Sequence, residues 1–400
     1  MIELLYYLLY IAFVNKYYMG VNYITRAVYK EFKRKVQPQK VLILLGARRV
    51  GKTMLINKFL SEQKSEDYIF FNGEDQETLD LLEERSINNY KRLIGEKKLL
   101  VIDEAQKIPS IGVKLKLLVD TIEGLHIIVT GSSVFDLANM LGEPLVGRAN
   151  TIKLFPFAQM EFAAHEDYSV TVSKLEERLI FGGYPELEHI ASWDDKMSYL
   201  DDVVSSNLLR DILTYEGVKK SDKLIDLLRL IAFQVGKEIN VQELANNLKG
   251  ISRNTVETYL DLLAKVFIIY KVRGFSRNLR KEIAKSNRWY FYDNGIRNAL
   301  VRNFNRLNMR NDVGELWENY LMSERIKHNS YKRKLTNYHF WRTYDQQKID
   351  LVEEASGNLC AFEFKWNTKK KVKAPGGWTK TYPEAFYEVI TKNNYLDFIT

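Results

Sequence analysis

The sequence predicts an α/β protein whose N-terminal part is a parallel sheet built around a glycine-rich loop. Three observations support this. Short apolar runs at 41–45, 99–102 and 126–129 have the length of strands buried on both faces. Stretches with helical spacing at 76–94 and 111–123 separate them, as crossover helices do in parallel sheets. The first run leads directly into GARRVGKT at 46–53, which a helical pattern follows.

Composition limits the class of protein. A chain of 400 residues suggests two or three domains, and 46% hydrophobic with 28% charged residues excludes a disordered or collagen-like chain. The single cysteine, Cys360, excludes an intrachain disulfide and indicates a reducing compartment, so we expect a cytoplasmic protein. The five histidines and this cysteine lack the spacing of a zinc site.

Charge is distributed unevenly along the chain. Residues 271–400 hold 25 basic and 14 acidic residues, whereas the first 270 hold 34 and 37. This asymmetry predicts a polyanionic partner for the C-terminal third. The alternative is a lysine-rich surface that is simply solvated.

The N-terminal residues 1–18 form a separate segment. Their apolar run ends at Asn15, which is too early to span a bilayer, and no basic residue precedes it as in a signal peptide. We expect this segment to come from an upstream start codon, with Met19 as the ordinary start. The alternative is an extra helix packed on the body. No other segment is expected to cross a membrane.

The loop at 46–53 predicts binding of ATP with Mg²⁺. Gly46 and Gly51 let backbone N–H groups approach phosphates, Lys52 can reach the β- and γ-phosphates, and the Thr53 hydroxyl can ligate the metal. A strand before the loop and a helix after it supply the required context. The remaining loop residues are Ala47, Arg48, Arg49 and Val50.

Polar residues follow the other predicted strands. Asp103 ends the run at 99–102, where a carboxylate can coordinate Mg²⁺ beside the loop, and Glu104 can deprotonate the attacking water. The run at 126–129 ends in Thr130, followed by Gly131, Ser132 and Ser133, and Thr130 could sense the γ-phosphate. Arg148 precedes a short strand expected at 151–154.

From about Met19 to its C-terminus the sequence resembles the bacterial and archaeal AAA-type ATPases that carry a characteristic C-terminal domain of unknown function. The matching motifs are GARRVGKT (46–53), LLVIDEAQKIP (99–109), IIVTGSS (127–133), LVGR (145–148), LFPFAQMEF (154–162), FGGYPE (181–186), LLRDI (208–212), RWYFYDNGIRNAL (288–300) and LWENYL (316–321). The resemblance implies an AAA-type core at 19–155 and a helical lid or connector at 156–235. It makes Arg148 a candidate arginine finger, which would contact ATP bound to a neighbouring subunit of a homo-oligomer. Arg48 and Arg49 agree with the basic P-loop of this family.

Residues 236–293 predict a winged helix-turn-helix. Apolar stripes at 241–248 and 256–263 indicate two helices separated by Gly250 and Ser252, and strand-like runs follow at 267–272 and 289–292. The second helix presents a mixed face, because Arg253 lies near Glu257 and Asp261. The loop between the strands is better suited to DNA phosphates. It contains Arg273, Arg277, Arg280, Lys281, Lys285 and Arg288. The alternative is a protein-interaction module.

Residues 294–400 predict a restriction-endonuclease-like domain. A hairpin of strands at 349–353 and 359–366 would place Asp350 beside Glu363 and Lys365, the pattern that holds Mg²⁺ and steadies a phosphate in such nucleases. Glu318, on a helix expected at 313–325, could complete this second site. Lys348 lies on the same strand face as Asp350, where its charge would compete with a metal. A nuclease-like fold can also persist without cleavage.

These patterns together predict a Mg²⁺-dependent ATPase that hydrolyses ATP to ADP and phosphate, coupled to DNA or to a protein partner. Two alternatives come from other classes. One is a non-catalytic ATP switch that controls a protein partner. The other is an ATP-gated DNA nuclease.

Overall fold

The structure is a computed structural model that describes residues 23–131, 145–208, 220–276, 287–343, 345–367 and 372–400. It forms two compact units, Met1–Leu154 and Phe155–Thr400, which are treated separately below. Several residues named above lie outside the described ranges. They are residues 1–18, Met19, residues 209–212 of the LLRDI motif, Ser132, Ser133, Arg277, Arg280, Lys281 and Lys285.

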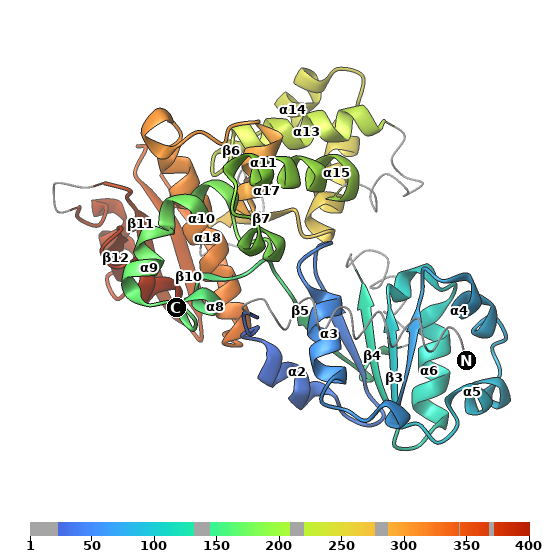
Figure 1. The fold of residues 1–400 in the computed structure, drawn as a ribbon. Helices are drawn as coiled ribbons and strands as arrows, with labels where there is room; N and C mark the ends of the chain where they lie inside the picture. Colours follow the sequence, from blue (N-terminus) through green and yellow to red (C-terminus); the bar gives the residue numbers. More distant parts are fainter. Residues whose placement is uncertain (1–22, 132–144, 209–219, 277–286, 344, 368–371) are drawn as a thin grey trace. The chain divides into compact units, whose positions relative to one another are not determined.

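The first unit contains a five-stranded sheet with the order β2-β3-β4-β1-β5, in which every pair of neighbours is parallel (Figure 1). All residues of β1 are buried, as its unbroken apolar run predicts. The strands are β1 (Val41–Leu45), β2 (Tyr68–Asn72), β3 (Leu99–Asp103), β4 (His126–Gly131) and β5 (Ala149–Lys153). The helices include α2 (Tyr29–Lys35), α3 (Lys52–Leu60) and α6 (Ile111–Thr121).

The stretch with helical spacing at 76–94 contains two helices, α4 (Gln76–Leu81) and α5 (Ile87–Ile94). Asp75 caps the first helix by accepting from the backbone N–H of Thr78, and Ser86 caps the second by accepting from that of Asn89. The stretch divides into two helices because the polar cap at Ser86 starts a new helix within it.

The second unit contains helices and a seven-stranded sheet with the order β12-β11-β10-β9-β7-β8-β6. Its strands are β6 (Glu238–Ile239), β7 (Ile269–Gly274), β8 (Asn287–Phe291), β9 (Asn337–Arg342), β10 (Lys348–Ala355), β11 (Asn358–Phe364) and β12 (Phe386–Ile390). Its helices include α8 (Gln159–Ala163), α9 (Tyr168–Ser173), α10 (Leu175–Phe181), α11 (Trp193–Asp202), α13 (Ser221–Phe233), α14 (Val241–Leu248), α15 (Arg253–Lys265), α17 (Asn294–Leu300), α18 (Val313–Tyr331), α19 (Gly376–Thr381) and α20 (Tyr395–Ile399).

A single sheet joins the region expected as a winged helix to the region expected as nuclease-like. Strand β7 pairs with β8 in antiparallel fashion and with β9 in parallel, with Arg273 opposite His339. The Phe275 N–H continues this contact by donating to the Phe340 carbonyl at 2.6 Å. The sheet therefore extends across residue 293, where the sequence suggests a domain boundary.

Helix α18 is six residues longer than the helix expected at 313–325. The helical spacing of apolar residues ends before the helix does, because the last turns of α18 bury polar side chains instead. Glu324, Lys327 and Asn329 are each at most 3% exposed and each has a hydrogen-bonded partner. A helix that buries paired polar groups is not recognised from hydrophobic periodicity alone.

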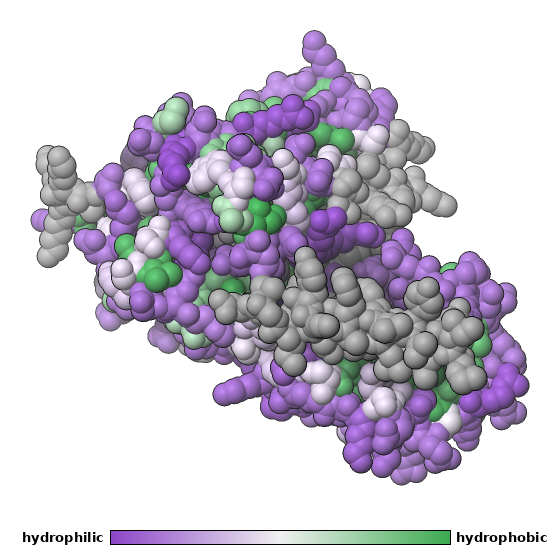
Figure 2. All heavy atoms as spheres, in the orientation of Figure 1, coloured by the Kyte–Doolittle hydropathy of each residue, from purple (hydrophilic) through white to green (hydrophobic). Residues whose placement is uncertain are grey.

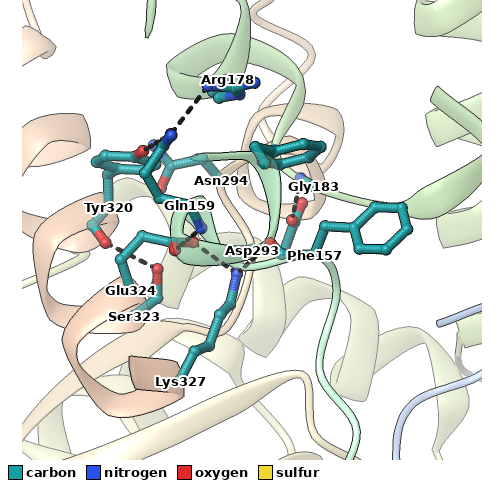
Figure 3. A pocket seen from close by; sticks show the side chains of 12 residues that line it. Phe157, Gln159, Arg178, Gly183, Asp293, Asn294, Tyr320, Ser323, Glu324 and Lys327 are labelled. Atoms are coloured by element: carbon teal, nitrogen blue, oxygen red, sulfur yellow. Dashed lines mark hydrogen bonds and ion pairs between the residues drawn. The ribbon is translucent and has the colours of Figure 1, made fainter. Parts of the chain in front are cut away.

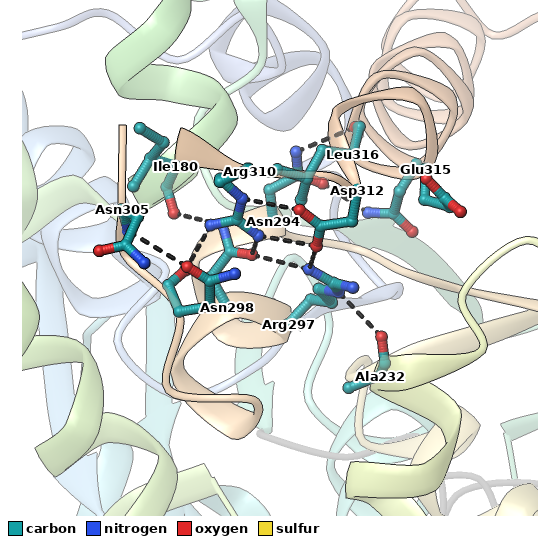
Figure 4. Close-up of polar contacts among 12 residues, drawn as sticks. Ile180, Ala232, Asn294, Arg297, Asn298, Asn305, Arg310, Asp312, Glu315 and Leu316 are labelled. Carbon is teal, nitrogen blue, oxygen red and sulfur yellow. Dashed lines mark hydrogen bonds and ion pairs between the residues drawn. The ribbon is translucent and has the colours of Figure 1, made fainter. Parts of the chain in front are cut away.

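A buried ionic network fixes the segment between α17 and α18 (Figure 4). Arg297 and Arg310 both donate to the Asp312 carboxylate, and Arg297 Nε also donates to the Ala232 carbonyl of α13 at 2.8 Å. Burial alone would raise the pKa of Asp312, but the hydrogen bonds from the two arginines lower it to about 2. The network thus ties α13, α17 and the start of α18 together.

The face shown in Figure 2 is mainly hydrophilic, and hydrophobic residues occur on it in separate small groups. Among the described residues, none of the helices combines the length and apolar character that a bilayer-spanning segment needs.

Two glycines of the second unit provide a test of how closely α17 packs against the end of α10. A Cβ on Gly295 would lie 1.9 Å from the Phe181 carbonyl oxygen, whereas one on Gly314 would meet nothing within 4 Å. We expect Gly295→Ala to lower the free energy of unfolding by about 1–3 kcal/mol through overpacking. Gly314→Ala should leave it unchanged or raise it by up to about 1 kcal/mol. Chemical denaturation of both variants measures this, and equal effects would contradict the packing described.

Candidate active site

The loop after β1 depends on its glycines. A Cβ on Gly46 would lie 2.2 Å from the carbonyl oxygen of Leu154, so only glycine fits between the strand ends. Gly51 has a φ of 92° and precedes the first residue of α3, which also favours glycine. The chain thereby passes from a buried strand to a helix N-terminus, where free backbone N–H groups can face an anion.

The lysine of the loop lies within the loop itself. The Lys52 Nζ donates to the carbonyls of Gly46 and Ala47, each at 3.0 Å, and the residue is 6% exposed. The Val50 carbonyl accepts from Arg26 Nη1 at 2.8 Å, a support that no sequence pattern indicated. The ammonium group is therefore held at the position where the motif predicts phosphates.

Three predicted residues converge beside the loop. The Thr53 hydroxyl donates to Asp103 Oδ2 at 2.9 Å, and the Thr130 hydroxyl donates to Asp103 Oδ1. Asp103 and Thr130 meet because β3 and β4 are parallel neighbours whose carboxyl ends lie at one edge. A hydroxyl and a carboxylate are the oxygen ligands that Mg²⁺ prefers, so Thr53 and Asp103 fit the expected metal.

Glu104 lies next to this pair in an unusual backbone conformation. Its φ of 49° is left-handed, its N–H donates to Thr130 Oγ1 at 3.0 Å, and its carboxylate accepts from Gln106 Nε2. Burial raises the pKa of the Glu104 carboxyl, while the Lys52 charge and the Gln106 hydrogen bond oppose this. A Cβ on Gly73 would lie 2.4 Å from the Glu104 carbonyl oxygen. The sequence analysis missed Gln106 and Gly73, whose roles depend on contacts made only in the folded protein.

The three arginines singled out in the first unit lie in different places. Arg49 occupies the loop with a φ of 62°, and the Arg48 charge helps to lower the pKa of Glu104. Arg148 lies at the opposite end of the sheet, because Ala149 pairs with the first residue of β1. A five-residue strand spans roughly 16 Å, so Arg148 does not reach the loop of its own chain. Its Nε donates to Asp120 at 2.6 Å.

The residues proposed for a second site also meet, in the second unit. Asp350 on β10 and Glu363 on β11 lie on adjacent antiparallel strands, and Glu318 on α18 faces them. Lys348 Nζ lies 3.3 Å from Asp350 Oδ1, and Lys365 Nζ lies 2.5 Å from Glu363 Oε1. The four predicted residues are therefore together, with Lys348 among them.

In the cluster of Glu318, Asp350 and Glu363, two carboxyl groups have raised pKa values. Burial, and then the charge of Asp350, raise the pKa of Glu318 to about 7, against the opposing effects of Arg288 and Tyr290. Burial and Asp350 also raise the pKa of Glu363. Within the described ranges, no group of three or more His, Cys, Asp or Glu side chains has an arrangement suited to holding a metal ion.

A small pocket of the second unit collects residues from four of the motifs noted in the sequence (Figure 3). Glu324 Oε2 accepts from the backbone N–H of Gln159, and Lys327 Nζ donates to the Phe157 carbonyl at 3.2 Å. Asp293 accepts from the Gly183 N–H at 2.8 Å. The motif residues that line the pocket are Phe157, Gln159, Phe162, Gly182, Gly183, Asp293, Asn294 and Tyr320. Residues of these motifs thus form a buried polar joint within the second unit.

The second helix of the expected winged helix, α15, has few free cations. Arg253 Nε lies 3.0 Å from Glu257, and Lys265 lies 2.7 Å from Asp261. Around it the elements follow the expected order of helix, turn, helix and hairpin, with α14, α15, β7 and β8. The strand β6, which pairs with β8, was not expected.

The first unit resembles AAA-type P-loop domains in its parallel sheet and in the glycine-rich loop that precedes α3. Residues 38–163 match a family model described as "AAA domain". Residues 313–397 match a "Domain of unknown function (DUF4143)", and residues 172–307 match another, DUF8612. The resemblance expected from the sequence is confirmed for the AAA domain and for a C-terminal domain of unknown function.

Two curated relatives similar to this chain are named only as uncharacterized proteins. One from Methanocaldococcus jannaschii is 24% identical over 269 residues, covering 63% of this chain and 60% of that protein. One from Mycobacterium tuberculosis is 26% identical over 337 residues, covering 83% and 72%. The chain thus spans about three fifths of the length of the archaeal relative.

Among solved structures, two of the replication initiator DnaA align with 61% of this chain and 90% of theirs. One is bound to AMPPCP and single-stranded DNA, with 15% identity and a TM-score of 0.30. The other, from Aquifex aeolicus and bound to AMPPCP, has 14% identity and a TM-score of 0.31. Scores this low carry no weight for function.

The Gln106 contact predicts a pH effect. Removing its hydrogen bond should raise the pKa of Glu104 further, so more of the carboxylate is protonated at low pH. If Glu104 is the base, the acid limb of ATPase activity should move to higher pH in Gln106→Ala. The control is Gln63→Ala, which changes an exposed glutamine. An unmoved acid limb would argue against the carboxylate as the titrating group.

Proposed function

We propose that this protein is a Mg²⁺-dependent ATPase that hydrolyses ATP to ADP and phosphate in its first unit. The observation that carries the proposal is the 2.9 Å pair of the Thr53 hydroxyl and the Asp103 carboxylate, placed beside Lys52 and Glu104. A ligand pair, a phosphate-binding lysine and a candidate base at one sheet edge are the parts that phosphoryl transfer to water requires.

Each residue has a definite role in this proposal. The loop N–H groups and Lys52 bind the phosphates, the lysine exchanging its carbonyl partners for phosphate oxygens. Thr53 and Asp103 hold Mg²⁺, which when bound neutralises phosphate charge. Glu104 accepts a proton from the attacking water at its carboxylate, and Thr130 sets the position of Asp103 and senses the γ-phosphate.

Arg148 acts in trans in this scheme. It lies at the far end of the sheet from its own loop, so it can contribute to catalysis only at the nucleotide of another copy. Such a role requires a homo-oligomer and release of the Arg148–Asp120 ion pair, whose side chains are each more than a third exposed. Exposed pairs of this kind are weak, so the release costs little.

The second unit couples hydrolysis to a partner, for which we favour DNA held by its phosphates. The basic surplus of residues 271–400 supports this, and the expected winged helix contributes a basic loop. The paired cations of α15 favour backbone contact over base readout. A protein partner is the alternative outcome of the DNA test below.

Two variants separate binding from hydrolysis. Lys52→Ala should abolish most ATP affinity, because it removes the ammonium that binds the phosphates. Glu104→Gln should bind ATP normally and hydrolyse it about 100-fold or more slowly, because it lacks the base. Glu96→Gln, at an exposed position, is the control. Wild-type turnover in Glu104→Gln would remove this residue as the base, and wild-type protein that binds but never hydrolyses ATP would instead be a nucleotide switch.

DNA binding should depend on salt and on the loop at 277–286. Affinity should fall steeply with added salt, because phosphate contacts release counterions. Changing Arg277, Arg280 and Lys281 to Gln should weaken binding to all DNA sequences alike. The control changes Lys30, Lys64 and Lys91, which lie on the first unit and are exposed, with the same loss of charge. Equal losses in both triple variants, or no binding at low salt, would exclude this loop as a DNA contact.

A further inference from the structure

The carboxylate cluster of the second unit combines side chains from four elements. Glu318 comes from α18, Asp350 from β10 and Glu363 from β11, while Arg288 and Tyr290 come from β8. Helix α18 packs against both β8 and β11, which brings these side chains together. A nuclease-like interpretation expects a divalent cation at this place, so the fit of these residues to a metal can be tested.

The oxygens that a metal would need already have partners. Asp350 Oδ1 lies 3.3 Å from Lys348 Nζ, and Asp350 Oδ2 accepts from the Phe364 N–H at 3.0 Å. Both oxygens of the central carboxylate are thus engaged by the protein itself.

The flanking carboxylates are engaged as well. Glu318 Oε1 accepts from the Tyr290 hydroxyl at 2.7 Å and lies 3.6 Å from Arg288. Glu363 Oε1 accepts from Lys365. Glu363 Oε2 is buried without a hydrogen-bond partner among the described residues. The hydrogen bond and the ion pair of Glu318 both involve its Oε1. Protein-bound Mg²⁺ is usually held through one or two carboxylates and completes its octahedron with water. Here both oxygens of the central carboxylate, Asp350, already have partners.

The charges of the cluster are balanced without a metal. Three carboxylates face three cations, Lys348, Lys365 and Arg288. Lys348 interacts with all three carboxylates. The charge of Asp350 raises the pKa of Lys348 most, and the charges of Glu318 and Glu363 raise it as well. A divalent cation would lie against the Lys348 ammonium, whose side chain is 49% exposed while that of Asp350 is 2% exposed. With no negative charge in surplus around Asp350, this repulsion disfavours the cation.

We propose that the ammonium of Lys348 takes the place of a divalent cation among Glu318, Asp350 and Glu363, so that this cluster is a metal-free ionic junction. The residues present therefore do not fit the metal that a nuclease-like domain implies. The junction fastens α18 to β8 and lies where β10 meets β11. This proposal does not depend on ATP hydrolysis by the first unit.

If the Lys348 ammonium excludes the metal, removing its charge should allow a divalent cation to bind. Lys348→Met keeps the length of the side chain and removes its charge, which leaves an excess of negative charge around Asp350. We expect this variant to gain one Mn²⁺ site that the wild-type protein lacks. It should also melt at a lower temperature than the wild type, and Mn²⁺ should restore part of the loss, because a ligand stabilises only the state that binds it.

The experiment measures Mn²⁺ binding by calorimetry and thermal unfolding with and without Mn²⁺, on the full chain without nucleotide. Lys332→Met, at an exposed position, is the matched control and should resemble the wild type. Adding Asp350→Asn to Lys348→Met should remove the new site, which separates it from Mn²⁺ at Thr53 and Asp103. Lys348→Gln serves if the methionine variant does not fold.

Two results would overturn the proposal. One is a Mn²⁺ site in the wild-type protein that Asp350→Asn abolishes, which would show that Lys348 does not exclude the cation. The other is a folded Lys348→Met or Lys348→Gln protein that binds no additional Mn²⁺, which would show that the lysine is not what occupies the site.

Discussion

The pairing of β1 with parallel neighbours on both sides is the constraint on which the nucleotide site depends. It fixes the loop at 46–53 at the carboxyl edge of the sheet, where β3 delivers Asp103 and Glu104 and β4 delivers Thr130. The same pairing carries Arg148 to the amino edge. Sheet direction alone therefore separates the predicted catalytic residues beside the loop from Arg148, which lies at the other edge of the sheet.

In the second unit, buried polar side chains determine how the elements are positioned. Helix α18 buries Asn319, Glu324 and Lys327 as well as apolar residues, and each makes hydrogen bonds to another segment of the chain. Buried polar groups are costly when unpaired, so such a helix fits only one arrangement of its neighbours. In this unit, hydrogen bonds between buried polar groups determine how the helices and strands pack. The pocket in Figure 3 and the cluster around Asp350 are both examples.

The sequence predicted much of the first unit because its signals are local. The loop residues 46–53 and the Asp103–Glu104 pair are adjacent to strands whose apolar runs are unbroken, so direction and position follow together. Gln106 donates to Glu104 only two residues away, a side-chain contact that hydrophobic periodicity does not signal. Gly73 and Arg26 escaped prediction because their contacts join distant segments. For the same reason the pairing of β7 with β9 was not foreseen. The hairpin of β10 and β11 was predicted, but whether Lys348 turns toward Asp350 or to solvent could be decided only by the fold.

The continuous sheet of the second unit bears on how this chain can be divided. Strand β7 lies between β8 and β9, so separating the chain after residue 293 would strip β7 and β9 of their shared hydrogen bonds. Each fragment would then expose a new sheet edge, and β9, with Tyr338, Phe340 and Trp341, is rich in aromatic residues. Unpaired edges of this composition invite self-association. A fragment that begins before β6 keeps every strand of the sheet and avoids this hazard.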